Sequence, residues 1–202
     1  MAFDNKSKSL SNELPIKTLS NITFGLKNGL SSYYLNNGDV SIRLVNVKDI
    51  RNGKVNVNSV ESIKVKETEA LVKNRLAEGD LLVTVKGQVF KAAVALKEME
   101  GFVISANLIA LTLNDEVYPE IVAAYLNSPS GRRELNAKAA GGSIKGLNAK
   151  TLLEVPVPVP TMEKQQALRQ YLSLVNEYND IVEREWKLMD GIRDSIMREI
   201  IG

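Results

Sequence analysis

The stretch "VPVPVPTMEKQQALRQYLSLV", residues 155–175, passes from alternating prolines to a helical pattern without an intervening loop. A proline fixes φ and lacks a donor N–H, so Pro156, Pro158 and Pro160 predict an extended segment at a sheet edge or outside a sheet. Thr161 is a suitable N-cap, and glutamines follow it as good helix formers. We therefore expect a folded domain to end here and a helix to begin at about residue 162.

The predicted helix carries an apolar residue at every seventh position. These residues form a seam: Leu168, Val175, Val182, Met189 and Ile196. A second apolar row beside the seam contains Tyr171, Tyr178 and Ile192. Glu185 and Glu199 interrupt this companion row, and apolar residues continue it one position later at Leu172, Trp186 and Ile200. A helix from 162 to 200 would be roughly 58 Å long at ~1.5 Å per residue. It either folds back on its own domain or, as its length and complete stripe favour, pairs with a second helix.

Composition excludes several classes of function. The 202 residues are 44% hydrophobic and 25% charged, and include neither cysteine nor histidine. The chain therefore has no disulfide or thiolate nucleophile, and it lacks the commonest general base and metal ligand. We predict no catalytic residue, no metal site and no enzymatic activity. No signal peptide or membrane-spanning run is recognisable, so we expect a cytoplasmic protein with no membrane partner.

The segments before the helix predict an α+β domain. Residues 41–50, 79–87, 91–96 and 101–113 read as strands, and "NGKVNV" (52–57) as an Asn-Gly turn leading into another. Residues 118–126 form an amphipathic helix that "NSPSG" (127–131) ends, and a short basic helix, a glycine-rich loop and the prolyl strand follow. We expect a mostly antiparallel, curved sheet with small helices over residues 14–160 and a long coiled-coil-like helix over 161–202. Residues 1–13 are polar, and we expect them to be disordered.

Charge and motifs give little support to an enzyme. Residues 14–160 hold 18 lysines and arginines against 14 acidic residues, and residues 161–202 hold 6 against 8. This surplus favours nucleic-acid binding only slightly. "AAGGSIKGLN" lacks the residue order of a phosphate-binding loop. "NSPSG" departs at two positions from the motif of amino-methylating DNA methyltransferases, and Asp39, Asp49 and Asp80 form no metal-binding pattern.

The order of segments from about Leu14 onward resembles the specificity (S) subunits of type I restriction-modification systems. The most specific part is "GGSIKGLNAKTLLEVPVPVP" followed by glutamines and a long helix. Such subunits usually carry two target-recognition domains, each followed by a spacer helix, and the two helices pair antiparallel. This chain has one of each, so the resemblance implies a half-subunit that works alone, works as a homodimer, or is a truncated or spare specificity cassette.

The resemblance also implies partners. They are double-stranded DNA, methyltransferase (M) subunits and a restriction subunit, with S-adenosylmethionine held by the methyltransferase and no cofactor in this chain. The outer face of the helix, with Arg169, Arg184 and Lys187, would meet the M subunits. A homodimer would read a bipartite palindromic site.

Three loops are candidates for contact with DNA, because lysines can meet phosphates and amides can reach base edges. Our first choice is Lys86, Gly87, Gln88 and Lys91; the second is Lys27, Asn28, Ser31, Ser32 and Tyr33; the third is Ser143 and Lys145. Each loop could equally be a solvated surface turn. Two other functions stay open: a protein-interaction module that uses the helix without DNA binding, and an enzyme of unrecognised kind.

Overall fold

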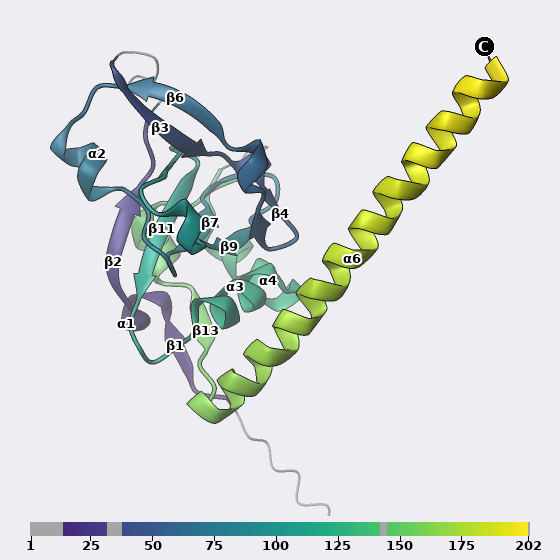
Figure 1. The fold of residues 1–202 in the computed structure, drawn as a ribbon. Coiled ribbons are helices and arrows are strands. Elements are labelled where there is room, and N and C mark those ends of the chain that lie inside the picture. The colour runs from purple at the N-terminus through teal and green to yellow at the C-terminus, as the bar shows by residue number, and fades with distance from the viewer. Residues whose placement is uncertain (1–13, 32–37, 142–144, 202) are drawn as a thin grey trace, which may run out of the picture. The chain divides into compact units, whose positions relative to one another are not determined.

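The computed structural model describes residues 14–31, 38–141 and 145–201 (Figure 1). Residues 1–13, predicted to be disordered, lie outside the described part. The chain divides into two compact units, one ending at Pro160 and the other beginning at Thr161. Among the described residues, no helix is long and apolar enough to span a membrane.

A four-stranded antiparallel sheet organises the first unit. Its strands, in spatial order, are β2 (Thr23–Asn28), β11 (Leu108–Leu113), β7 (Leu81–Thr84) and β9 (Ala92–Val94). All four residues of β7 are buried, because α3 (Pro119–Asn127) packs against β7 and β9 while a hydrophobic cluster covers the other face. A strand covered on both faces reads as a continuous apolar run.

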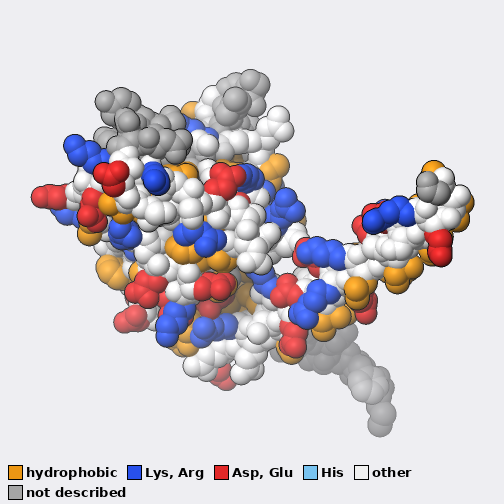
Figure 2. Space-filling view, turned by 45° about the horizontal axis from the view of Figure 1, so that its top comes forward, with side chains coloured by type: hydrophobic (Ala, Val, Ile, Leu, Met, Phe, Trp, Pro, Cys, Tyr) orange, Lys and Arg blue, Asp and Glu red, His pale blue; other side chains and the backbone are white. Residues whose placement is uncertain are grey.

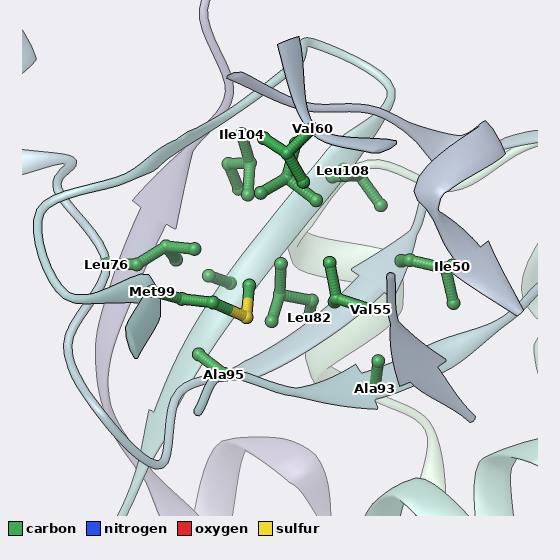
Figure 3. Close-up of a cluster of buried hydrophobic side chains, with 12 residues drawn as sticks. Ile50, Val55, Val60, Leu76, Leu82, Ala93, Ala95, Met99, Ile104 and Leu108 are labelled. Carbon is green, nitrogen blue, oxygen red and sulfur yellow. The ribbon is translucent and has the colours of Figure 1, made fainter. Parts of the chain in front are cut away.

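That hydrophobic cluster joins the sheet to the segments around it (Figure 3). Leu82 and Ala93 of the sheet meet Ile50 and Val55 of a small hairpin and Met99 of a 3-10 helix. The hairpin strands are β4 (Ile50–Arg51) and β5 (Lys54–Val55). Asn52 and Gly53 between them have φ of 50° and 76°, as a two-residue type I′ turn requires. The predicted Asn-Gly turn is confirmed.

A second sheet has three strands in the order β10 (Val103–Ile104), β3 (Val40–Val45) and β6 (Glu61–Val65). β3 and β6 are antiparallel, whereas β10 and β3 are parallel. The prediction of one strand over 101–113 is therefore wrong: the turn at Ser105–Asn107 separates β10 in one sheet from β11 in the other. The α+β class with mostly antiparallel strands is confirmed.

The prolyl segment forms β13 (Pro156–Pro158), which pairs antiparallel with β1 (Ile16–Thr18). Leu19 N donates to Val155 O at 3.0 Å and Val159 N donates to Pro15 O at 2.8 Å, so the odd-numbered residues face β1. Successive residues of a strand turn their backbone groups to alternate sides. Pro156 and Pro158 therefore face away from β1, where no described strand pairs with β13. The prediction of an extended edge segment is confirmed.

The helices α2 (Glu69–Lys73), α4 (Pro129–Lys138) and α5 (Ala149–Leu153) begin at side-chain caps. Thr68, Ser128 and Asn148 each accept a hydrogen bond from the backbone N–H three residues later. "NSPSG" ends α3, but Pro129 to Gly131 already form the first turn of the next helix, because Ser128 caps both. The remaining short elements are α1 (Leu19–Ile22), β8 (Lys86–Gly87), β12 (Lys145–Gly146) and the 3-10 helices Val47–Asp49, Val57–Ser59 and Lys97–Met99.

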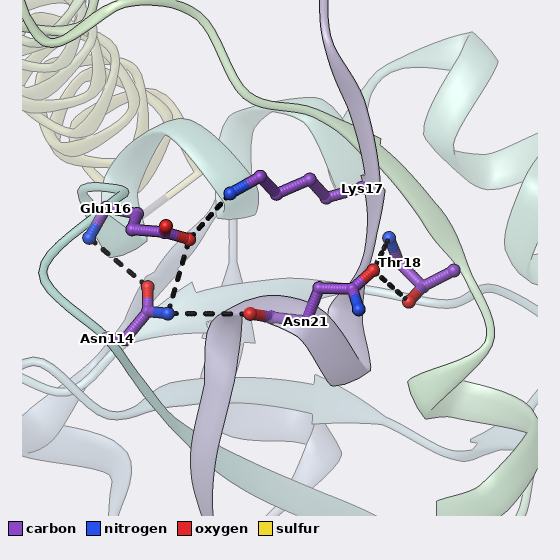
Figure 4. Close-up of polar contacts among 5 residues, drawn as sticks. All are labelled: Lys17, Thr18, Asn21, Asn114 and Glu116. Carbon is purple, nitrogen blue, oxygen red and sulfur yellow. Dashed lines mark hydrogen bonds and ion pairs between the residues drawn. The ribbon is translucent and has the colours of Figure 1, made fainter.

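A polar network fastens β1 and α1 to the end of β11 (Figure 4). Lys17 Nζ donates to Glu116 Oε2 at 2.8 Å, and Asn114 Nδ2 donates to Asn21 O at 3.5 Å. Asn21 Oδ1 accepts from both the N–H and the hydroxyl of Thr18. The hydrogen bond from Lys17 holds the pKa of Glu116 below its ordinary value. The network lies at the end of the sheet where Thr23 pairs with Leu113.

The second unit is one helix, α6 (Met162–Ile201), with 40 residues. At ~1.5 Å per residue it is roughly 60 Å long, and its predicted start is confirmed: Gln165 N donates to Thr161 O at 2.9 Å. Most of its large apolar side chains are exposed, and they gather along one side of the helix (Figure 2). Val175 and Val182 of the seam are half-buried. A further apolar row, which the sequence analysis missed, contains Leu174, Ile181 and Leu188.

Candidate nucleic-acid interface

Strand register brings separate loops to one end of the four-stranded sheet. Asn28 pairs with Ile109, and Thr84 pairs with Leu108, so β2 and β7 end where β11 begins. Thr84 N donates to Lys91 O at 2.9 Å, which places the start of β9 beside them. Residues 28–31, 85–91 and 105–107 therefore meet. We call this end of the sheet, with these three segments, the loop end.

Backbone hydrogen bonds continue the sheet into the loops. Leu30 N donates to Ile104 O and Ala106 N to Leu30 O; Val85 N donates to Asn107 O at 2.8 Å. Leu147 N donates to Val85 O, and β8 pairs with β12. The described residues on either side of 142–144 thus join the loop end. The structure brings together the described parts of all three predicted loops.

Lys86 and Gln88 are both exposed at the loop end. The ammonium of Lys86 makes no ion pair or hydrogen bond with any residue that the structure describes, so it is available to an anion. Gly87 between them has φ of 145°, a conformation that side chains disfavour. This segment has the geometry that its predicted role requires, and the role itself stays a prediction.

Lys91 does not fit its predicted role. Its Nζ donates to Ile50 O at 2.9 Å, and its N–H donates to Thr84 Oγ1 at 2.7 Å. The half-buried side chain connects β9 to the β4–β5 hairpin instead of pointing freely at solvent. We therefore leave Lys91 out of the proposed set of phosphate contacts.

Lys27 is not the loop residue that the sequence suggested. It lies within β2, and its Nζ is 2.5 Å from Asp80 Oδ2. The side chain of Asp80 is fully buried and that of Lys27 is 16% exposed. A lysine held in a buried ion pair stabilises the fold and is not free to meet a phosphate. We therefore do not include Lys27 among the proposed phosphate contacts either. Asn28 ends β2 and is exposed, and its N–H donates to Asn74 Oδ1 at 2.7 Å.

The other predicted residues are placed only in part. Ser31 is exposed beside the Leu30–Ser105 bridge and has an interaction of its own. Lys145 pairs with Gly87 through the backbone, and its side chain lies outside the described part. Ser32, Tyr33 and Ser143 are also outside the described residues, so their roles stay predictions.

The structure adds a residue that the sequence analysis missed. Asn107 is exposed in the Ser105–Asn107 turn, between the segments at Leu30 and Val85. The signal was present in "ISANL", where a small polar group interrupts an apolar run. It was overlooked because residues 101–113 were read as one strand.

Two groups of residues considered for chemistry in the sequence, the acidic residues and "NSPSG", can be placed in the described part of the chain. No group of three or more acidic side chains lies close enough there to hold a metal ion. Both amide atoms of Asn127 in "NSPSG" bond to the backbone of Ala92, at 2.8 and 2.9 Å. The amide of Asn127 therefore pairs with the backbone of β9 as a neighbouring strand would, and it is not available to a substrate base. Figure 2 shows lysines and arginines interspersed with acidic residues on the face in view.

Residues 15–187 match the family described as the type I restriction modification DNA specificity domain. The match covers well over half of the chain, and the chain belongs to this family.

Particular relatives agree. The chain is 23% identical over 144 residues to the type I restriction enzyme EcoBI specificity subunit of Escherichia coli, covering 71% of this chain and 30% of the relative. It is similar in fold to the HsdS subunit from Thermoanaerobacter tengcongensis, with a TM-score of 0.61, 19% identity, and coverage of 90% of this chain and 42% of that one. A chain of a type I R-M system gives a TM-score of 0.63 with 18% identity over 90% of this chain and 43% of that one. The chain thus spans less than half the length of each.

Proposed function

We propose that this chain is a sequence-specific DNA-binding specificity subunit of a type I restriction-modification complex. Family membership supports the proposal, and so does one structural observation: loops far apart in the sequence meet at the loop end through the sheet register. Lys86 would contact phosphate, while Gln88, Asn28 and Ser31 would face base edges. Catalysis is assigned to partners and not to this chain.

The test compares two exposed lysines on the same domain. Lys86 lies at the loop end, whereas Lys97 follows β9 beyond the Val94–Leu81 pair, at the opposite end of the sheet. We expect Lys86→Ala to weaken binding to every duplex sequence and to reduce the salt slope by about 0.9 for one lost phosphate contact. The measurement is fluorescence anisotropy with duplex DNA over a range of salt concentrations, with the methyltransferase partner present.

Lys97→Ala is the matched control and should bind as the wild type does. Equal slopes for the wild type and Lys86→Ala would remove Lys86 from the interface. If the wild type failed to bind DNA, the alternative of a protein-interaction module that uses only α6 would stand. The exposed apolar stripe of α6 is the observation that favours that alternative.

We also propose that α6 pairs antiparallel with α6 of a second copy. The support is its exposed stripe: Tyr171, Tyr178 and Ile192 are 64%, 66% and 57% exposed, and Leu168, Met189 and Ile196 are exposed as well. A soluble helix does not normally leave so large an apolar surface in water. Each recognition unit joins the first residue of its helix, so antiparallel pairing would place the two units at opposite ends. Such a homodimer would read the same half-site twice in inverted orientation.

Further partners follow from the family. The row of Leu174, Ile181 and Leu188 widens the stripe beyond what one partner helix covers, and the methyltransferase subunits are the proposed occupants. Arg169, Arg184 and Lys187 on α6 are the residues expected to make polar contacts there, although Lys187 already pairs with Glu183 at 2.9 Å. S-adenosylmethionine would be held by the methyltransferase, and a restriction subunit would join the same complex.

A further inference from the structure

The Ser105–Asn107 turn occupies the middle of the loop end. On one side, Leu30 N donates to Ile104 O at 2.7 Å and accepts at its carbonyl from Ala106 N at 2.9 Å. On the other side, Val85 N donates to Asn107 O at 2.8 Å. Backbone hydrogen bonds from both neighbouring segments therefore fix the turn, and the segments are those that carry the predicted DNA contacts.

Nothing in the described structure requires an asparagine at position 107. An asparagine is sometimes needed where the backbone is left-handed. Asn52 is the only non-glycine residue with positive φ among the described residues, so this reason does not apply to Asn107. Its side chain is exposed and makes no hydrogen bond with any residue in 14–31, 38–141 or 145–201. Asn127 and Asn74, by contrast, use their amides to bond backbone groups. The amide of Asn107 is free for an external partner.

An amide side chain carries a donor and an acceptor side by side, which matches the N6 and N7 groups of adenine in the major groove. Discrimination between bases requires that the reading side chain be held on a rigid support. We propose that Asn107 reads a base pair directly and selects adenine at that position. The inference rests on the proposed DNA-binding function and adds a central reading residue to it.

The experiment selects bound sequences from a random duplex library, with the methyltransferase partner present. The proteins are the wild type, Asn107→Ala, Asn107→Asp and the control Lys97→Ala, which changes an exposed side chain at the opposite end of the sheet. We expect the wild type and Lys97→Ala to enrich the same sequence. Asn107→Ala should lose preference for adenine at a single position of each half-site by about 5- to 150-fold, with the other positions unchanged. Asn107→Asp, which loses the donor, should change preference at that same position.

Two results would overturn the inference while leaving the proposed function intact. In one, all four proteins enrich the same sequence with the same strength. In the other, Asn107→Ala weakens binding to all sequences equally and lowers the Tm, which would show that Asn107 only supports the turn. A wild type that enriches no sequence would overturn the proposed function and this inference together.

Discussion

Asp80 is a fully buried carboxylate that groups from separate parts of the chain satisfy. Oδ2 accepts from Lys27 Nζ at 2.5 Å and from Ala77 N at 2.8 Å, and Oδ1 accepts from Thr112 Oγ1 at 2.7 Å. A buried charge is tolerated when it is paired and hydrogen-bonded. The cluster therefore fixes β2 and β11 to the turn that precedes β7.

Lys27→Met tests this structural role. The substitution keeps the apolar stem and removes the ammonium, leaving the Asp80 carboxylate buried without a counter-charge. We expect the free energy of unfolding in urea to fall by about 3–5 kcal/mol. Lys17→Met is the matched control, because the Lys17–Glu116 pair is exposed and should matter far less. Equal losses for the two variants would contradict the account of Asp80.

Gly29 is a second position that matters for the fold, because a side chain there would have no space. A Cβ at Gly29 would lie 1.9 Å from Ser105 O and 2.7 Å from Ala106 N, and both are backbone atoms that cannot move aside. We expect Gly29→Ala to separate residues 28–31 from the Ser105–Asn107 turn and to reduce the unfolding free energy by about 1–3 kcal/mol.

Gly191→Ala is the opposite case and serves as the control for Gly29→Ala. Gly191 lies within α6, and a Cβ there would meet no atom within 4 Å. Alanine is a better helix former, so this variant should stabilise α6 by about 1 kcal/mol. Circular dichroism during thermal unfolding measures both variants. A stabilised Gly29→Ala protein would show that the loops at that end are not held as described.

Local sequence signals predicted some of the helices, strands and turns and missed others. The Asn52–Gly53 turn and the prolyl strand were predictable, because the backbone limits of glycine and proline act locally. The division of residues 101–113 between two sheets was not, since each half is apolar and only tertiary pairing separates them. The β8–β12 pair was missed because it too depends on tertiary pairing. The short helix α5 was missed although its Asn148 cap is a local signal.

The candidate site shows the same limit. Sequence alone proposed three candidate loops, but it could not show that their described parts meet through the register of β2, β7 and β11. It also could not distinguish Lys86, which is free among the described residues, from Lys27 and Lys91. The partners of those two lysines lie 53 and 41 residues away along the chain.

The seam of α6 gives a test of the proposed pairing. Asp at both Val175 and Val182 would bury two carboxylates of each chain without partners in the dimer, at a cost on the order of several kcal/mol. We expect the wild type to sediment as a dimer and the double variant as a monomer with its first unit still folded. Gln170→Asp with Ser173→Asp adds the same charge on the other side of α6, and this control should remain dimeric. A monomeric wild type well above micromolar concentration would contradict the homodimer.

For the whole molecule, we propose that two copies of one loop end read one DNA site. The two copies are identical, so a two-fold axis requires the same half-site in inverted orientation on either side of an unread spacer. A single recognition unit would not have this symmetry. The symmetry would be detected only in the sequence of the DNA that the assembled protein selects.

The most direct measurement is selection of bound sequences by the wild-type protein from a random duplex library, with the methyltransferase partner present. We predict enrichment of a palindrome whose two halves are separated by a spacer of fixed length and free sequence. An enriched site with two different halves would contradict the homodimer, and a bound pool with no enriched sequence would contradict DNA reading by this chain.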